Sequence, residues 1–301
     1  MPNPLFSPSR RHLLRYLSGS VTLSGLLGTL DQALAASEVP VRRMPSIFVG
    51  HGTPMNALQD NAFTRRLQQW GREIGRPRAI LMVSAHWLTR GSTEVAVVSQ
   101  PETIHDFGGF PRELNQMQYP APGSPAVAAQ ALAALKSVNA QPSEAWGLDH
   151  GAWTVLHHLY PSADVPVFQV SIDYAQGGKY HLAVGRALAA LRDKGVLVAG
   201  SGNVVHNLRA TEPSDALRMQ ASQPWAQAFD SAVTKALNAG DVDALADYRS
   251  LDASYAAATP TPDHYWPMLY ALGAAGAGDK LQYPFAGFQN GTISMRCMQW
   301  G

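Results

Sequence analysis

Short apolar runs recur along the chain from residue 46 onward, separated by longer segments with polar and apolar positions mixed. Runs of four to eight apolar residues are typical of strands buried on both faces, as in parallel sheets. Alternation of such strands with helical segments predicts an α/β fold: a single domain whose mostly parallel central sheet has helices on both faces. The predicted strands are 46–50, 79–85, 165–172 and 196–200.

The segments between these runs carry apolar residues at helical spacing. In 62–74, Phe63, Leu67, Trp70 and Ile74 share one helical face. A serine–proline pair at 124–125 is a typical helix start. The end of the chain, 292–299, instead alternates polar and apolar residues, which predicts a strand at the edge of the sheet. The other predicted helices are 127–135, 153–160, 181–191 and 225–237.

The first 36 residues have the pattern of an export signal. An arginine pair, Arg10 and Arg11, precedes two leucines, and a mild apolar stretch too short to span a membrane follows at 21–30. Ala33-Leu34-Ala35 then offers the small residues that signal peptidase accepts. We therefore predict a twin-arginine signal peptide at 1–36, export to the periplasm by the twin-arginine translocase, and a mature enzyme domain at 37–301.

Charge and cysteine content narrow the possible functions. The 301 residues carry a formal net charge of +1, and removal of residues 1–36, with three arginines and one aspartate, leaves about −1. Neither value favours a nucleic-acid partner or an anionic membrane surface for the mature form. The single cysteine, Cys297, excludes an internal disulfide and a thiolate-rich metal site. With ten histidines in the chain, any bound metal must rely on imidazole and carboxylate.

Three histidines follow predicted strands. His51 directly follows the first strand, His86 the second, and His206 comes a few residues after the fourth. Ligands of open α/β sheets bind beyond the carboxyl ends of the strands, so these three side chains are placed to converge. Each of them alone is more often a structural residue than a ligand, but three at equivalent positions favour a site.

Three further histidines lie in predicted loops. His264 stands in a proline-bracketed entry to an apolar helix, and position alone assigns it no role. His150, in a turn before the helix 153–160, follows an aspartate and can be an oriented acid or base, or a helix cap. His105 lies in a loop rich in glycine and aromatic residues, suited either to lining a pocket or to organising the loop.

Seven motifs occur in a fixed order along the chain: GHGTPMNAL, SAHW, TIHDFGGFP, YPAPGSP, WGLDHGAW, GSGNVVHNLR and TPDHYWPMLYALG. Together they closely resemble the 4,5-DOPA extradiol dioxygenase group of the class III, LigB-like ring-cleaving dioxygenases. The resemblance runs from about Met44 to the C-terminus, and seven motifs in a fixed order are far more specific than any one of them.

The resemblance implies one metal ion per chain, with ligands at His51, His86 and His264. His206 matches a position that is either a further ligand or the acid–base histidine, and His150 matches a histidine beside the substrate oxygens. In the wider superfamily a glutamate usually holds the place of His264. Iron(II) oxygenases normally use two histidines and a carboxylate, and an all-imidazole site suits zinc equally, so Fe(II) and Zn(II) both remain open.

The implied activity is cleavage of a small aromatic diol such as DOPA by O2, outside the diol. Two other functions fit the same histidines. A zinc hydrolase would bind zinc and take up no oxygen, although the chain has neither an HExxH motif nor a serine-nucleophile motif. A non-catalytic metal-binding protein is the third, and retention of His150 and His206 argues against it.

Overall fold

The computed structural model describes residues 41–211, 219 and 221–301, and the predicted signal peptide lies outside them. A six-stranded sheet in the order β6-β2-β8-β1-β12-β9 runs through the described domain. Strands β6, β2, β8 and β1 pair in parallel, while β12 is antiparallel to both β1 and β9. The sheet strands are β1 (Ser46–Gly50), β2 (Ala79–Ser84), β6 (Val167–Gln169), β8 (Val196–Gly202), β9 (Leu281–Phe285) and β12 (Cys297–Trp300).

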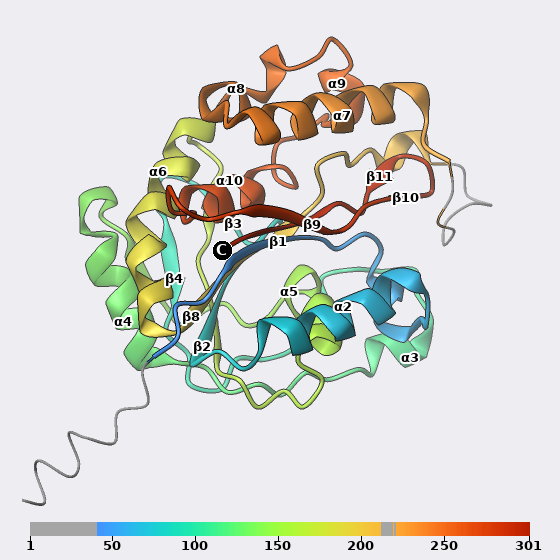
Figure 1. Cartoon of the computed structure of the whole chain (residues 1–301). Coiled ribbons are helices and arrows are strands. Elements are labelled where there is room, and N and C mark those ends of the chain that lie inside the picture. Colours follow the sequence, from blue (N-terminus) through green and yellow to red (C-terminus); the bar gives the residue numbers. More distant parts are fainter. Residues whose placement is uncertain (1–40, 212–218, 220) are drawn as a thin grey trace, which may run out of the picture. The chain divides into compact units, whose positions relative to one another are not determined.

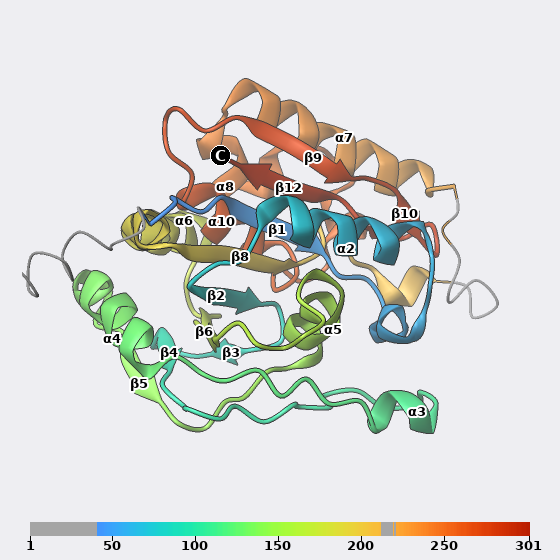
Figure 2. The same cartoon turned by 60° about the horizontal axis from the view of Figure 1, so that its bottom comes forward.

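Helices cover both faces of this sheet, as predicted (Figures 1 and 2). On one face, α2 and α5 pack on alternate strand residues such as Ile47 and Ile80. On the other face, α4, α6, α7 and α10 share a core with the opposite set, including Phe48 and Leu81. Strands buried on both faces explain why their sequences are continuous apolar runs. The helices are α2 (Ala62–Ile74), α4 (Pro125–Ala134), α5 (His150–Leu159), α6 (Gly178–Leu188), α7 (Pro224–Ala239) and α10 (Trp266–Gly273).

The remaining elements are short and lie mostly in the connections. The predicted strand 165–172 is divided between β6 and the separate β7, which pairs with β3. No helix in the described part of the chain is long and apolar enough to cross a membrane. The short elements are η1 (Pro54–Leu58), α3 (Arg112–Asn115), α8 (Val242–Ala246), α9 (Tyr255–Ala258), β3 (Leu88–Thr89), β4 (Glu94–Ala96), β5 (Gln141–Ser143), β7 (Ile172–Asp173), β10 (Phe288–Gln289) and β11 (Ile293–Ser294).

The prediction that 292–299 forms an edge strand is wrong. This segment contains β11 and most of β12, and β12 lies between β1 and β9 inside the sheet. Its polar side chains are satisfied within the protein rather than by water: Ser294 donates to Asp230, and Gln299 accepts from the Trp70 indole at 2.6 Å. The edge strand is β9, whose Pro284 cannot donate to a ladder and is tolerated at an edge.

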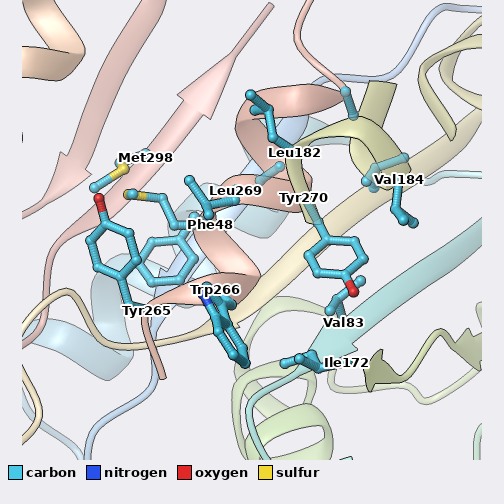
Figure 3. Packing of buried hydrophobic residues seen from close by; sticks show 14 of the residues in the cluster. Phe48, Val83, Ile172, Leu182, Val184, Tyr265, Trp266, Leu269, Tyr270 and Met298 are labelled. Carbon is cyan, nitrogen blue, oxygen red and sulfur yellow. The ribbon is translucent and has the colours of Figure 1, made fainter. Parts of the chain in front are cut away.

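Helix α10 is almost entirely buried, and its packing depends on glycines. A Cβ at Gly185 of α6 would lie 2.4 Å from the Tyr270 carbonyl oxygen, and a Cβ at Gly273 would lie 2.3 Å from the Leu182 carbonyl oxygen. Only glycine lets the two helices approach this closely. In Figure 3 the Tyr270 ring extends from α10 toward Val83 of β2. The sheet, α10 and α6 thus form one continuous core, on which the loop preceding α10 is held.

His181 of α6 gives this core a measurable pH dependence. The side chain is fully buried, and its Nδ1 lies 3.0 Å from the Tyr270 hydroxyl. Burial lowers the pKa of His181 to about 4, although Asp173 and the Gln176 backbone favour the charged form. Between pH 6.5 and pH 4 the unfolded chain therefore binds more protons than the folded one, and stability is lost as the pH falls.

The free energy of unfolding of the wild type should fall between pH 7 and pH 5. In His181→Asn we expect this fall to be smaller by about 2 kcal/mol. Asparagine keeps a polar group near Nδ1 but does not titrate. Urea unfolding at both pH values measures the difference. Equal drops in the two proteins would show that His181 does not contribute.

Candidate metal centre

Five histidines line a single cavity of about 440 Å³. This volume lies in the usual range for small-molecule sites, roughly 300–1,000 Å³. A larger cavity of about 670 Å³, bordered by Arg66, Glu73 and Tyr283, has no histidine in its described wall. Side-chain chemistry, and not size, therefore identifies the functional cavity. Its histidines are His51, His86, His150, His206 and His264.

Adjacent parallel strands bring His51, His86 and His206 to one edge of the sheet. They follow β1, β2 and β8 respectively, and β8 lies between the other two strands. The backbone N–H of His51 donates to the Gly202 carbonyl at 3.0 Å, which ties the end of β1 to the end of β8. The three side chains that the sequence placed at strand ends thus reach the same cavity.

The other two histidines come from the surrounding segments. His264 precedes α10, and a Cβ at Gly202 would lie 2.1 Å from its carbonyl oxygen, so only glycine there allows this approach. His150 is the first residue of α5, whose N-cap is Asp149. The structure therefore places His150 inside the helix rather than in the preceding turn, with its ring beside that of His86.

The rings of His51, His86 and His264 form a nearly equilateral triangle. Their centroids are 5.2 Å apart for His51–His86, 5.2 Å for His51–His264 and 5.0 Å for His86–His264. Imidazoles bound to one tetrahedral ion at 2.0–2.1 Å have nitrogens about 3.3 Å apart and ring centroids about 5 Å apart. The Nε2 atoms of His51 and His86 are separated by 3.5 Å. The ring spacing of this triangle therefore matches that of three imidazoles around one ion.

His150 and His206 each pack against one member of this triangle. The His150 ring lies 3.8 Å from that of His86, at an interplanar angle of 45°. The His206 ring stacks on His264 at 3.5 Å and is parallel to it within 5°. The nitrogen positions favour a different trio from the ring spacing: His51, His86 and His150 each offer a nitrogen, and these atoms all lie within 4.8 Å of one another. Among the described residues His264 belongs to no such group.

Hydrogen bonds at Nδ1 orient two members of the triangle. His51 Nδ1 lies 3.0 Å from Ser201 Oγ, and this hydroxyl donates to the Gly151 carbonyl, so the imidazole must be the donor to it. His264 Nδ1 lies 2.5 Å from Asp263 Oδ2. In both residues Nε2 is left as the nitrogen with a free lone pair, as is usual for histidines that bind metals.

Asp106, to which the sequence analysis assigned no role, carries negative charge to the cavity wall. Its Oδ2 lies 3.0 Å from His150 Nδ1 and 3.5 Å from His86 Nδ1, and its Oδ1 accepts the His150 backbone N–H at 2.9 Å. Burial favours the neutral acid, but the hydrogen bonds from His150 and the charge of the imidazoles outweigh it and lower the pKa of Asp106 to about 2. The carboxylate is thus ionised and can orient both rings.

His105, the neighbour of Asp106, does not line the cavity. Its Nε2 lies 3.0 Å from the Met117 carbonyl oxygen, so it organises the loop, one of the two roles that the sequence left open. Phe107 and Phe110 of the same loop do reach the cavity. An aspartate next to a histidine in a loop rich in glycine and aromatic residues was the available signal for Asp106.

Burial keeps the imidazoles of His51, His86, His206 and His264 neutral near pH 7. It lowers the pKa of His86 and of His206 to about 4, and it lowers the pKa of His51 and His264 well below the usual 6.5. Repulsion from neighbouring imidazoles adds to the effect in each case. A metal competes with protons for imidazole nitrogens, so neutral rings near pH 7 are available as ligands.

The rest of the described cavity wall is mainly apolar. The Phe107 ring packs edge-on against His150, with ring centroids 5.5 Å apart, and against Phe110, with ring centroids 5.4 Å apart. Phe107 and Phe110 thus form an aromatic wall beside the histidines. Such a wall suits a flat aromatic ligand and excludes water around it. The non-histidine lining is Gly52, Thr53, Pro54, Phe107, Phe110, Leu208, Thr211, Asn290 and Ile293.

Comparisons with known proteins agree with this chemistry. Residues 43–293 match the family model "Catalytic LigB subunit of aromatic ring-opening dioxygenase". A 4,5-DOPA dioxygenase extradiol of Escherichia coli (strain K12) is 45% identical over 264 residues, which cover 86% of this chain and 95% of that protein. A protein with the same description from Beta vulgaris is 40% identical, covering 83% of this chain and 93% of its own length.

A solved structure extends the agreement to the fold. The crystal structure of an uncharacterized protein from Escherichia coli K12 superposes with a TM-score of 0.74 at 40% identity, covering 86% of this chain and all of that one. The family match spans nearly the whole described domain and includes all five histidines of the cavity. The chain therefore belongs to the LigB family of aromatic ring-opening dioxygenases.

Proposed function

We propose that this protein is an extradiol dioxygenase that opens the ring of a catechol such as DOPA with O2, using one metal ion. The observation that carries the proposal is the triangle of His51, His86 and His264 at the head of an aromatic-walled cavity. Of the three functions compatible with the histidines, family membership favours the dioxygenase.

We assign the ligands to His51, His86 and His264, and not to the group that contains His150. Imidazoles that bind one ion point toward it from different directions, so the distances between their ring centroids are similar. His150 departs from this pattern, since its ring is 3.8 Å from His86 but 5.9 Å from His51. His206 is stacked face to face on His264, so both lone pairs cannot point at one ion. His150 and His206 are then the two histidines left for acid–base work.

The ion would bind both catechol oxygens and O2 and lower the pKa of the catechol hydroxyls. Iron(II) is the ion that we expect to support turnover, because zinc(II) has no redox chemistry with which to reduce O2. The three imidazoles themselves suit either ion. Zinc in the same site would thus give a loaded but inactive protein.

The remaining residues bind the ring and handle protons. Phe107 and Phe110 would hold the catechol ring and exclude water. His206 is neutral near pH 7 because burial lowers its pKa to about 4, so it can accept a proton from a hydroxyl and return it to the product. Asp106 fixes His150 through Nδ1, which leaves His150 Nε2 free to hydrogen-bond a substrate oxygen.

Reconstitution of the metal-free protein tests the proposal. Protein loaded with Fe(II) under anaerobic conditions should consume one O2 per catechol opened, and Zn(II)-loaded protein should consume none. A catechol panel including DOPA would define the substrate. Catechol binding without oxygen uptake by the Fe(II) form would instead favour a hydrolase or a non-catalytic metal-binding protein.

We also propose that residues 1–36 direct export through the twin-arginine translocase and that the enzyme works in the periplasm. The arginine pair and the alanine-rich site support this, and the family match begins only at residue 43. Replacement of both Arg10 and Arg11 by lysine should leave the protein in the cytoplasm. Arrival of this variant in the periplasm, measured by cell fractionation, would refute the twin-arginine assignment.

A further inference from the structure

A small hairpin forms part of the cavity wall. Its strands β10 and β11 are joined by Asn290, Gly291 and Thr292, and the first two of these have φ angles of 58° and 70°. Two consecutive left-handed residues, asparagine then glycine, are typical of a tight type I′ turn. The turn presents Asn290 to the cavity wall.

Contacts on both sides hold this hairpin in place. Gln289 Oε1 accepts the Thr53 backbone N–H at 2.8 Å, beside His51. On the other side Ile293 pairs with His206, and the Ser294 N–H donates to the Val205 carbonyl at 3.0 Å. The hairpin is thus fixed to the segments that carry two of the cavity histidines, and the position of Asn290 relative to them is set by backbone contacts.

The amide oxygen of Asn290 is buried and has no partner in the part of the chain that the structure describes. The residue is 6% exposed, and its Oδ1 has no hydrogen-bond partner among the described residues. A buried polar atom without a partner costs free energy, so it calls for a specific explanation. The turn requires a residue that adopts a positive φ angle, and asparagine does so, but glycine would serve the turn equally well. The turn does not explain an amide in the wall of a mainly apolar cavity.

We propose that the Asn290 amide hydrogen-bonds a polar group on the ring substituent of the catechol and thereby selects catechols with such a group. The inference rests on the proposed function. An amide can accept from an amine or donate to a carboxylate, and rotation of the side chain exchanges the two roles. Asn290 is therefore a specificity residue: it acts on the tail of the substrate, while the histidines act on the diol.

The test compares Asn290→Gly and Asn290→Asp with the wild type. Both variants tolerate positive φ, so the turn is kept while the amide is removed or made anionic. Anaerobic dissociation constants of the Fe(II)-loaded proteins are measured for 4-methylcatechol, dopamine and 3,4-dihydroxyphenylacetate. For Asn290→Gly we expect the preference for the polar-tailed catechol over 4-methylcatechol to fall about three- to tenfold, as loss of one hydrogen bond implies.

The aspartate variant identifies the tail chemistry. An amine tail should gain affinity relative to the carboxylate tail in Asn290→Asp, and steady-state KM values should follow the same order. Asn139→Gly is the matched control, because Asn139 also has positive φ (51°) but is exposed and does not line the cavity.

Each outcome decides the proposal. Preference ratios that stay at the wild-type value in both Asn290 variants would overturn it, as would an equal shift in Asn139→Gly. The dissociation constants are measured without oxygen, so this inference and the proposed function can fail separately. A protein that binds the polar-tailed and methyl catechols with different affinity but never consumes O2 would overturn the proposed function and leave this inference standing. Binding of no catechol by the wild-type protein would overturn both.

Discussion

Replacement of His264 by alanine is expected to empty the metal centre, whereas His206→Ala should keep the metal and slow turnover. In the proposed triangle His264 is one of three ligands, and two imidazoles alone bind an ion weakly. His206 is stacked on His264 and does not radiate from the common point. Its loss should remove only an acid–base group, whose usual contribution is about 10²–10⁴ in rate.

Metal content and turnover measured on the same purified variants test this assignment. His150→Ala is the third protein to include, since the His150 nitrogens approach those of His51 and His86 within 4.8 Å. If His150→Ala loses its metal and His264→Ala retains it, the third ligand is His150 and not His264. If His206→Ala retains its metal and is fully active, His206 has only a structural role.

Asp106→Asn is expected to reduce kcat about 10- to 100-fold while the protein still binds its metal. The carboxylate lies 3.0 Å from His150 Nδ1, and its negative charge favours the tautomer with the proton on Nδ1 and the free lone pair on Nε2. An asparagine can present its NH₂ group to Nδ1 instead, which favours the opposite tautomer. The contact of the carboxylate with His86 Nδ1 at 3.5 Å loses its negative partner at the same time.

The pH profile separates orientation from simple loss of stability. Because Asp106 is ionised above a pKa of about 2, the wild-type profile should not reflect its titration at any pH where the enzyme is folded. The variant should be slower across the whole profile and keep its melting temperature within a few degrees. Asp60→Asn, at an exposed carboxylate that pairs with Arg65, is the matched control. Activity of Asp106→Asn within twofold of the wild type would show that Asp106 does not orient His150.

The parallel part of the sheet, the helices on its faces and the meeting of three histidines could be predicted from local sequence patterns. The three histidines are His51, His86 and His206. Strands buried on both faces need continuous apolar runs, and amphipathic helices need apolar residues every three or four positions, so both leave a direct pattern. Neighbouring parallel strands end at one edge of the sheet, so residues that follow them meet without any long-range information. The roles of His264 and His150 came from motif resemblance, since neither residue follows a predicted strand.

The residues that support these histidines and the position of the C-terminal strand could not be predicted in this way, because both depend on long-range contacts. The alternation of polar and apolar residues in 292–299 is the pattern of an edge strand, whose polar side chains face water. The polar side chains of Ser294 and Gln299 instead bond to partners within the protein, and this difference leaves no trace in the local sequence. Asp106 and Asn290 lie 44 and 140 residues from His150 along the chain. Their roles depend on contacts between segments distant in sequence. Such contacts follow from how the loops pack over the sheet edge, which no local periodicity encodes.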